Sequence, residues 1–332
     1  MPNGFVKPAM RATLRENCGH SPAQLTRQLR EIASGFHGTV GIAVASADCP
    51  WIAGHNPESY FPQQSVSKLW VSIAVLDLVD RGLVQLDDQV RIDRADLTVL
   101  NQPIRQEVLV RGMVVRSLRR LMRDALSLSD NTANDQLLQR AGGPAAIRQL
   151  FRRKGIIGVR FGPGERLLQS SIAGLTWRPD LSLGPNFYRA RAALPDPIRR
   201  SALDTYLANP VDGAKPAGIA RGLKALAAGR LLSAASTRHL LHELSNTRSG
   251  PLRLKAGVPK GWAVSHKTGT GQELGNRATG YNDVGLLCSP TGRCYAVAVM
   301  IGETRETIAA RMRLMQAVSR SVVRFDQQRP AT

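Results

Sequence analysis

The sequence predicts an α+β fold with two lobes, one built around a β-sheet and the other built from helices and inserted into the first. Strand-like stretches rich in β-branched residues occur near the N-terminus and again in the last third of the chain, and helical periodicity fills the region between them. The 332 residues are enough for one large or two ordinary domains. We therefore expect a loose arm over 1–20, an α/β lobe formed by 21–60 and 212–326, and a helical lobe over 61–211.

The α/β lobe is predicted to contain five strands and a helix near each end of the chain. Ser21 is a suitable cap for a helix over 22–34, in which Leu25 and Leu29 share one face. A second helix is expected over 307–323, where apolar residues again recur on one face. The strands are expected over 39–46, 51–54, 263–266, 283–288 and 294–301.

A helix that is apolar on nearly every side is predicted over 66–79 and closed by Gly82. Ser65 lies at its first turn, where unpaired backbone N–H groups and the helix dipole favour a developing negative charge. Lys68 follows three positions later, so it shares a face with Ser65. Because a buried lysine is costly unless it has partners or loses its proton, the pair is a candidate base beside a candidate nucleophile. The alternative is a capping serine beside a surface lysine.

The rest of the middle region is predicted to be helical but less regular. Residues 83–112 show no clear pattern, and 156–210, where proline and glycine steps recur, is the least regular region. An amphipathic helix is expected over 113–128, with its polar face filled by Arg116, Arg119, Arg120 and Arg123. Further helices are expected over 132–140, 144–155, 197–208, 215–229 and 236–245.

The net charge of +20 favours anionic partners, and a basic protein that binds anionic polymers is one hypothesis. The arginines are spread over predicted solvated helix faces, however, and no aromatic residues alternate with them as a platform for stacking bases requires. We therefore expect no specific nucleic-acid partner. No apolar run approaches the ~18–20 residues of a membrane span.

The cysteines and histidines predict no metal site and no cofactor. None of the four cysteines has metal-ligand spacing, and His239 and His242 lack a third ligand in a plausible place. Cys288 and Cys294 flank a predicted hairpin turn. In an oxidising compartment they would form a cross-strand disulfide, and otherwise they would be two small buried apolar side chains.

Two further polar motifs are ambiguous one at a time. Ser129-Asp130-Asn131 has the composition of a helix cap, and the stretch from His266 to Gly271, which reads His-Lys-Thr-Gly-Thr-Gly, follows a strand without the upstream glycine of a phosphate-binding loop. Together, a Ser/Lys pair at a helix start, then Ser-Asp-Asn, then Lys-Thr-Gly resembles the signature of class A β-lactamases and penicillin-binding proteins. The likeness extends over about residues 22–325, including 61–72 and 126–138.

The resemblance implies a fold and a set of catalytic roles. It implies an antiparallel five-stranded sheet flanked by the terminal helices, an inserted all-helical lobe and an active site between them, with an enlarged omega-loop region over about 156–210. Ser65 would be the nucleophile, and either Lys68, or Glu165 through a water, would take its proton, a choice that is disputed for this family. Ser129 would pass a proton to the leaving nitrogen. Glu165, which lies 36 residues after Ser129, would activate water for deacylation.

The resemblance also implies the substrate-binding residues. The oxyanion would lie between the backbone N–H groups of Ser65 and Thr270, and Lys267 would disfavour the charged form of Lys68. Asn131 would orient Lys68 and contact the amide of the substrate side chain. The full expected set is Asn131, Lys267, Thr268, Gly269, Thr270 and Gln169.

Four features depart from the family pattern. Gln169 stands where the family has Asn, and Asn101 stands where it often has an aromatic residue. The segment 171–208 is longer than usual. The usual carboxylate-binding arginine on the strand after Lys-Thr-Gly is not evident, and Arg277 lies nearby in what the pattern predicts to be a lengthened loop.

The leading interpretation is a serine β-lactamase of class A type, which forms an acyl-enzyme on Ser65 and acts as a monomer on a small β-lactam or peptidoglycan-like substrate. The departures support an alternative, a related esterase or D-Ala-D-Ala peptidase that is acylated at Ser65 and turns lactams over poorly. A non-catalytic binding module is the third hypothesis. The resemblance implies a periplasmic or secreted protein, although residues 1–29 show no signal peptide.

Overall fold

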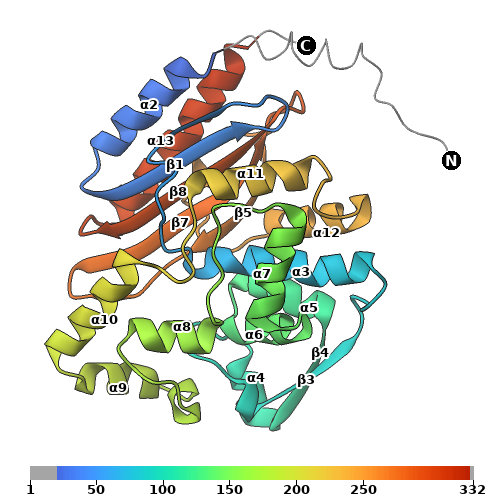
Figure 1. The fold of residues 1–332 in the computed structure, drawn as a ribbon, viewed down its shortest axis with the longest axis vertical. Coiled ribbons are helices and arrows are strands. Elements are labelled where there is room, and N and C mark those ends of the chain that lie inside the picture. Colours follow the sequence, from blue (N-terminus) through green and yellow to red (C-terminus); the bar gives the residue numbers. More distant parts are fainter. Residues whose placement is uncertain (1–20, 330–332) are drawn as a thin grey trace.

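A computed structural model describes residues 21–329, so the arm predicted over 1–20 lies outside the described residues. Both lobes are visible in Figure 1, the sheet with its flanking helices in one and a cluster of helices in the other. The strands of the main sheet are β1 (Gly38–Ser46), β2 (Ile52–His55), β5 (Ala263–Gly269), β6 (Glu273–Leu274), β7 (Arg277–Cys288) and β8 (Cys294–Thr304). Five of them follow the order β2-β1-β8-β7-β5, and the two-residue β6 pairs with β7.

Every pairing in this sheet is antiparallel, as the resemblance implies. Side chains of β8 alternate between its two faces, because successive residues of a strand point to opposite sides. Ala296 and Ala298 pack toward the helical lobe, whereas Val297 and Val299 pack toward the terminal helices. A sheet covered on both faces explains why these strands contain few polar residues.

The helices divide between the two faces of the sheet and the second lobe. In Figure 1, α2 and α13 lie over one face and α11 over the other. In chain order the helices are α2 (Ala23–Ser34), α3 (Lys68–Asp80), α4 (Arg105–Arg111), α5 (Leu118–Arg123), α6 (Asn131–Arg140), α7 (Gly143–Lys154), α8 (Glu165–Ile172), α9 (Asn186–Ala193), α10 (Asp196–Ala208), α11 (Pro216–Ala227), α12 (Ala234–Ser245) and α13 (Ile308–Gln327).

Helix α3 is the centre of the structure, as its all-round hydrophobicity predicts. Its first ten residues, 68–77, are all buried, and Trp70 and Val75 are inaccessible to solvent. A short 3-10 turn, Gln64–Ser67, precedes it. The helix ends at Asp80, and Gly82 adopts the left-handed backbone conformation, with φ of +70°, that glycine tolerates best.

The prediction of one continuous helix over 113–128 is wrong for its first five residues. These form strand β4 (Met113–Ser117), which pairs with β3 (Gln89–Asp93) in a separate two-stranded sheet. Val114 lies opposite Ile92, so a β-branched residue that also fits the helical pattern is used in a strand. The helical lobe therefore carries a small sheet in addition to its helices.

The region 156–210 is more regular than its proline and glycine content predicts. It contains α8, α9 and α10, of which only α10 is expected from the sequence. Pro197 lies in the first turn of α10, where the missing N–H is not needed, and Gly164 and Gly174 have positive φ at the ends of α8. Two small apolar clusters hold the segment in place, one around Phe187 and one around Tyr206.

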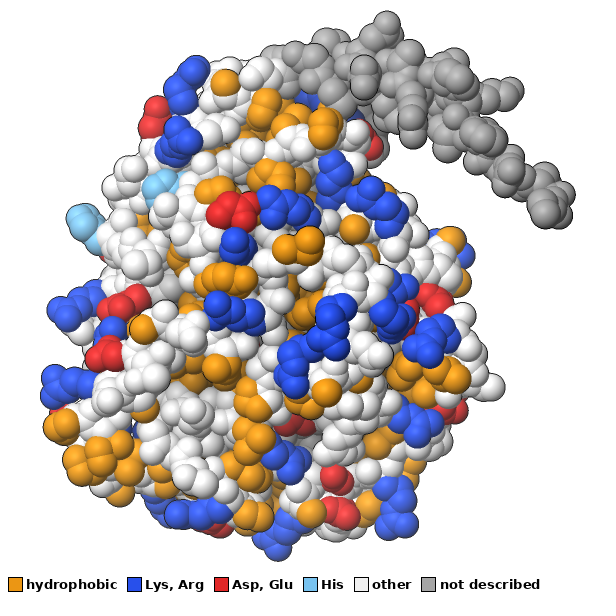
Figure 2. Space-filling view, viewed as in Figure 1, with side chains coloured by type: hydrophobic (Ala, Val, Ile, Leu, Met, Phe, Trp, Pro, Cys, Tyr) orange, Lys and Arg blue, Asp and Glu red, His pale blue; other side chains and the backbone are white. Residues whose placement is uncertain are grey.

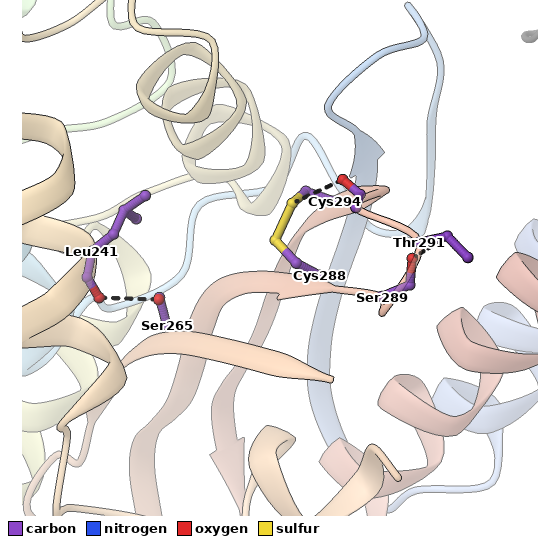
Figure 3. The surroundings of a disulfide bond; sticks show 7 residues. Leu241, Ser265, Cys288, Ser289, Thr291 and Cys294 are labelled. Carbon is purple, nitrogen blue, oxygen red and sulfur yellow. Dashed lines mark hydrogen bonds between the residues drawn. A yellow bond between two sulfur atoms is a disulfide. The ribbon is translucent and has the colours of Figure 1, made fainter. Parts of the chain in front are cut away.

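The turn between β7 and β8 carries a disulfide, which decides between the two alternatives for Cys288 and Cys294. The two residues face each other in the strand register, and Figure 3 shows the bridge beside the tip of the hairpin.

On the face seen in Figure 2, Lys and Arg are scattered among other side chains and do not form one stripe. Within residues 21–329, no helix has both the length and the apolar character that crossing a membrane requires.

Candidate active site

The nucleophile predicted from the sequence lies in the turn that leads into α3. Ser65 is half-buried, and Lys68, the first residue of α3, is fully buried below it. Lys68 Nζ lies 2.9 Å from Ser65 Oγ. The hydroxyl is therefore accessible to a substrate while its candidate base is shielded from water.

Two further groups complete the surroundings of Lys68. Its Nζ donates to Asn131 Oδ1 at 2.8 Å and forms a buried ion pair with Glu165 Oε1. An ammonium has three donors, and here three acceptors receive them. This arrangement offsets the desolvation of the charge, and Lys68 is placed to pass one proton to Glu165 and then to accept one from Ser65.

Glu165 is held at the first position of α8 by a carboxylate from α6. Asp135 Oδ1 accepts from the backbone N–H of Glu165 at 3.0 Å, and its Oδ2 accepts from that of Arg166 at 3.3 Å. Burial, and then the negative charge of Glu165, raise the pKa of Asp135 to about 6. Asp135 thus connects the helical lobe to the start of α8.

Gln169 lies one turn after Glu165 and faces the same side of α8. Its Nε2 lies 3.3 Å from Glu165 Oε2 and 3.0 Å from Gln64 Oε1. Gln272, from the loop after β5, donates to its side-chain oxygen at 3.1 Å and to its backbone oxygen at 2.8 Å. The longer side chain is therefore fixed at both ends of its amide.

Ser129 approaches the site from the opposite side, in the loop between α5 and α6. Its backbone is left-handed, with φ of +60°, and Asn101 donates to the backbone oxygens of Leu128 and Ser129 at 2.8 and 2.9 Å. Asn101 thus supports this loop. Ser129 Oγ accepts from Lys267 Nζ at 3.1 Å, which joins the helical lobe to strand β5.

Strand β5 forms the side of the site that contains Lys267, Thr268 and Gly269. Lys267 is fully buried, and burial, then Lys68 and Arg253, hold its pKa well below the usual value for lysine. Lys68 thus contributes to the lowered pKa of Lys267, and the effect of Lys267 on Lys68 that the resemblance implies stays a prediction. A Cβ at Gly269 would collide with the carbonyl oxygen of Gln63, so glycine lets the strand approach the nucleophile turn closely.

The two threonines on this side of the site differ in exposure. Thr268 is buried, and its hydroxyl lies 2.6 Å from the Ser249 hydroxyl. Thr270 is exposed at the end of β5. The backbone of Thr270 is therefore at the open side of the site.

Arg253 is a site residue that the sequence analysis missed. Its guanidinium is buried, donates to Thr270 Oγ1 at 2.6 Å and to the backbone oxygen of Gly269 at 3.0 Å, and lies 3.8 Å above the ring of Tyr281. It comes from an irregular loop before β5 rather than from the strand after Lys-Thr-Gly, and no local pattern marks it. Arg277, considered from the sequence, lies in β7 and not in a loop, where it pairs with Asp204 and Glu303.

Among residues 21–329, no group of three or more metal-ligating side chains is present. His239 and His242 lie on α12 and are not part of such a group. The groups that the structure brings together at the site are the hydroxyls of Ser65 and Ser129, the amines of Lys68 and Lys267, the carboxylate of Glu165 and the guanidinium of Arg253.

Comparisons with known proteins identify the family to which the chain belongs. Residues 24–325 match the model of the β-lactamase enzyme family. The chain is 27% identical to the extended-spectrum β-lactamase PER-1 of Pseudomonas aeruginosa, over 94% of this chain and 90% of that protein. The crystal structure of a β-lactamase from Chitinophaga pinensis superposes with a TM-score of 0.74 at 27% identity, covering 91% of this chain and 99% of that one. An ancestral class A β-lactamase gives a TM-score of 0.71 at 29% identity, covering 91% and 99%. The chain therefore belongs to the β-lactamase enzyme family.

Proposed function

We propose that the protein is a serine β-lactamase of class A type that forms an acyl-enzyme on Ser65 and hydrolyses it with the help of Glu165. One observation carries the proposal: a buried Lys68 amine that contacts the hydroxyl of Ser65, the amide of Asn131 and the carboxylate of Glu165. A hydroxyl with a base in contact, and a third group that orients the base, is the arrangement of an activated nucleophile.

In the acylation step, Ser65 Oγ attacks the lactam carbonyl while its proton passes to Lys68 or, through Lys68, to Glu165. The carbonyl oxygen takes the negative charge, for which the N–H groups of Ser65 and Thr270 are the proposed donors. The lactam C–N bond then breaks, and Ser129 donates its proton to the nitrogen. Its contact with Lys267 supports this role, because the ammonium can return a proton to the hydroxyl.

The positive groups at the end of β5 are proposed to bind the carboxylate that β-lactams carry. Lys267 and Arg253 both lie against this strand end, and Arg253 places its guanidinium on Thr270. A buried cation with few competing waters binds an anion more strongly than an exposed one. Thr268 and Gly269 shape the strand edge, and Asn131 is proposed to contact the amide of the acyl side chain.

Before deacylation, the proton taken from Ser65 leaves Lys68 and Glu165 for bulk water, and Lys267 takes one proton from water to replace the one it passed to Ser129. In the deacylation step, the ionised Glu165 takes a proton from a water, the resulting hydroxide attacks the ester carbon, and the ester bond to Ser65 Oγ breaks. The serine recovers its proton from Glu165 through Lys68. Gln169 and Lys68 hold the two oxygens of Glu165, so the carboxylate keeps a fixed orientation for this step.

The test is a time course of intact mass and product after benzylpenicillin is added. The wild type should form an adduct that disappears as penicilloate is released, and Ser65→Ala should form neither. The absence of both adduct and turnover in folded wild type would refute the proposal. An adduct that persists on the wild type would instead support the alternative, a penicillin-acylated peptidase or esterase.

We also propose that the protein works outside the cytoplasm. The Cys288–Cys294 disulfide supports this location, since such bonds persist in oxidising compartments. Fractionation of cells that produce the protein, with detection of the oxidised pair in the extracytoplasmic fraction, tests it. Recovery of the protein only as a cytoplasmic dithiol would contradict it.

A further inference from the structure

A buried chain of hydrogen bonds connects the lengthened segment 171–208 to the general base. Its first member is Tyr206 on α10, a residue with no place in the mechanism above. The Tyr206 hydroxyl donates to Asp212 Oδ1 at 2.8 Å and accepts from Gln64 Nε2 at 2.7 Å. Gln64 Oε1 accepts from Gln169 Nε2 at 3.0 Å, and Gln169 Nε2 also lies 3.3 Å from Glu165 Oε2.

The groups at the two ends of this series of hydrogen bonds, the phenol of Tyr206 and the carboxylate of Glu165, determine which group donates and which accepts in each bond. Burial, and then the charge of Asp212, raise the pKa of Tyr206 well above 10, so the phenol keeps its proton and donates to the carboxylate. The phenol oxygen can then only accept, which turns the NH₂ of Gln64 toward Tyr206 and its carbonyl toward Gln169. Gln169 must present its own NH₂ to Gln64, and the same NH₂ reaches Glu165.

The same hydrogen bonds also stabilise a backbone conformation next to the nucleophile. Gln64 precedes Ser65 and has φ of +53°, a left-handed conformation that is unfavourable for a residue with a side chain. Its backbone N–H donates to Asp212 Oδ2 at 2.8 Å, so Asp212 binds both the main chain of Gln64 and the phenol that orients its side chain. Such strain persists only where the surroundings hold it in place.

We propose that Tyr206 is a positioning residue for deacylation, which acts through the amides of Gln64 and Gln169 to hold Glu165 in its productive orientation. The inference rests on the proposed function and adds a role for the lengthened segment, which supplies this tyrosine. Acylation should depend on Tyr206 much less, because Lys68 contacts Ser65 and Asn131 directly and the backbone of Gln64 is held by Asp212.

The test compares Tyr206→Phe with Tyr188→Phe, which removes a phenol from an exposed position on α9 of the same segment. Tyr206→Phe removes both hydrogen bonds of the phenol, and loss of the one to Gln64, which leads to Glu165, should slow deacylation by about fivefold to tenfold. Because only the second step is affected, kcat and KM should fall together while kcat/KM stays unchanged, and acyl-enzyme should accumulate in intact mass. Tyr188→Phe should match the wild type. A variant that was merely less well folded would lose kcat and keep its KM.

A double-mutant cycle tests the route of the effect. Gln64→Leu should reproduce the defect of Tyr206→Phe, and the double variant should be no slower than the slower single variant, since both changes break the same chain. If Tyr206→Phe does not fold, Gln64→Leu alone carries the prediction of a deacylation defect.

Two results separate failure of this inference from failure of the proposed function. Wild type that forms no adduct at Ser65 overturns both. Wild type that turns over, with Tyr206→Phe and Gln64→Leu deacylating at the wild-type rate, overturns only the role of Tyr206. Fully additive losses in the double variant would overturn the route through Gln64.

Discussion

Asp135 should make the stability of the protein decrease as the pH rises from acid to neutral. Its carboxyl is buried between α6 and α8, and burial, followed by the charge of Glu165, raises its pKa from 3.8 to about 6. A carboxyl group whose pKa is higher in the folded than in the unfolded state favours folding when it is protonated. This contribution to stability is complete below the unfolded-state pKa, and it is lost as the pH rises through the folded-state pKa. The shift of about two pKa units corresponds to about 3 kcal/mol, at 1.36 kcal/mol per unit.

The perturbation that tests this is Asp135→Asn. Asparagine keeps one oxygen that can accept from the backbone of Glu165, but its NH₂ cannot accept from Arg166, so the variant loses the weaker bond. Because asparagine does not titrate, the variant should gain about 3 kcal/mol in free energy of unfolding, relative to wild type, as the pH rises from about 3 to about 7.5. Urea unfolding of both proteins across this range measures the difference, and other titrating groups largely cancel between them.

A control with the opposite sign is available at Asp80. Burial raises its pKa, but hydrogen bonds from Ser233 and Ser236 outweigh this effect and hold the pKa below the usual value. Asp80→Asn should therefore become more destabilising, relative to wild type, as the pH rises from about 3 to 5. If the gap between Asp135→Asn and wild type stays constant over the whole range, the reasoning about the buried carboxylate is wrong.

Three further predictions concern the site and the hairpin. Glu165→Gln should leave the protein acylated on Ser65 and slow deacylation about 10²–10⁴-fold, as seen by intact mass, because the base is lost and the shape is kept; deacylation near the wild-type rate would contradict it. Arg253→Ala should raise the KM of a penicillin about tenfold or more, because a buried charge-assisted contact with the substrate carboxylate is lost. The KM of the corresponding penicillin ester, which has no carboxylate, should not change. Equal effects on both substrates would argue against a carboxylate-binding role for Arg253. Replacing Cys288 and Cys294 by serine should lower the free energy of unfolding by about 2 kcal/mol, given their separation of 6 residues. Turnover should stay unchanged. A large loss of turnover in folded protein would contradict this prediction and show that the disulfide supports the site.

The fold class and the motifs around which the site is built could be predicted from the order of the residues alone. The helix over 66–79 could be predicted because its hydrophobicity on every side has one physical outcome, burial, and this makes the lysine at its start informative. The strands at the chain ends could be predicted because a sheet covered on both faces needs runs of apolar, β-branched residues. Ser65, Ser129 and Lys267 were identified as a set by the order of their motifs.

The residues that lie beside these motifs could not be predicted, because they come from distant segments of the chain. Val114 and Val115 fit a helical pattern as well as a strand, and pairing with β3, which no local signal predicts, made the difference. Arg253 and Tyr206 look like ordinary loop and helix residues in the sequence, and the roles proposed for them depend on burial against β5 and Gln64, which removes them from water. The physical reason is the same in each case: local sequence sets which conformations are favourable, whereas contacts between distant segments set which charges and hydrogen bonds are shielded from solvent.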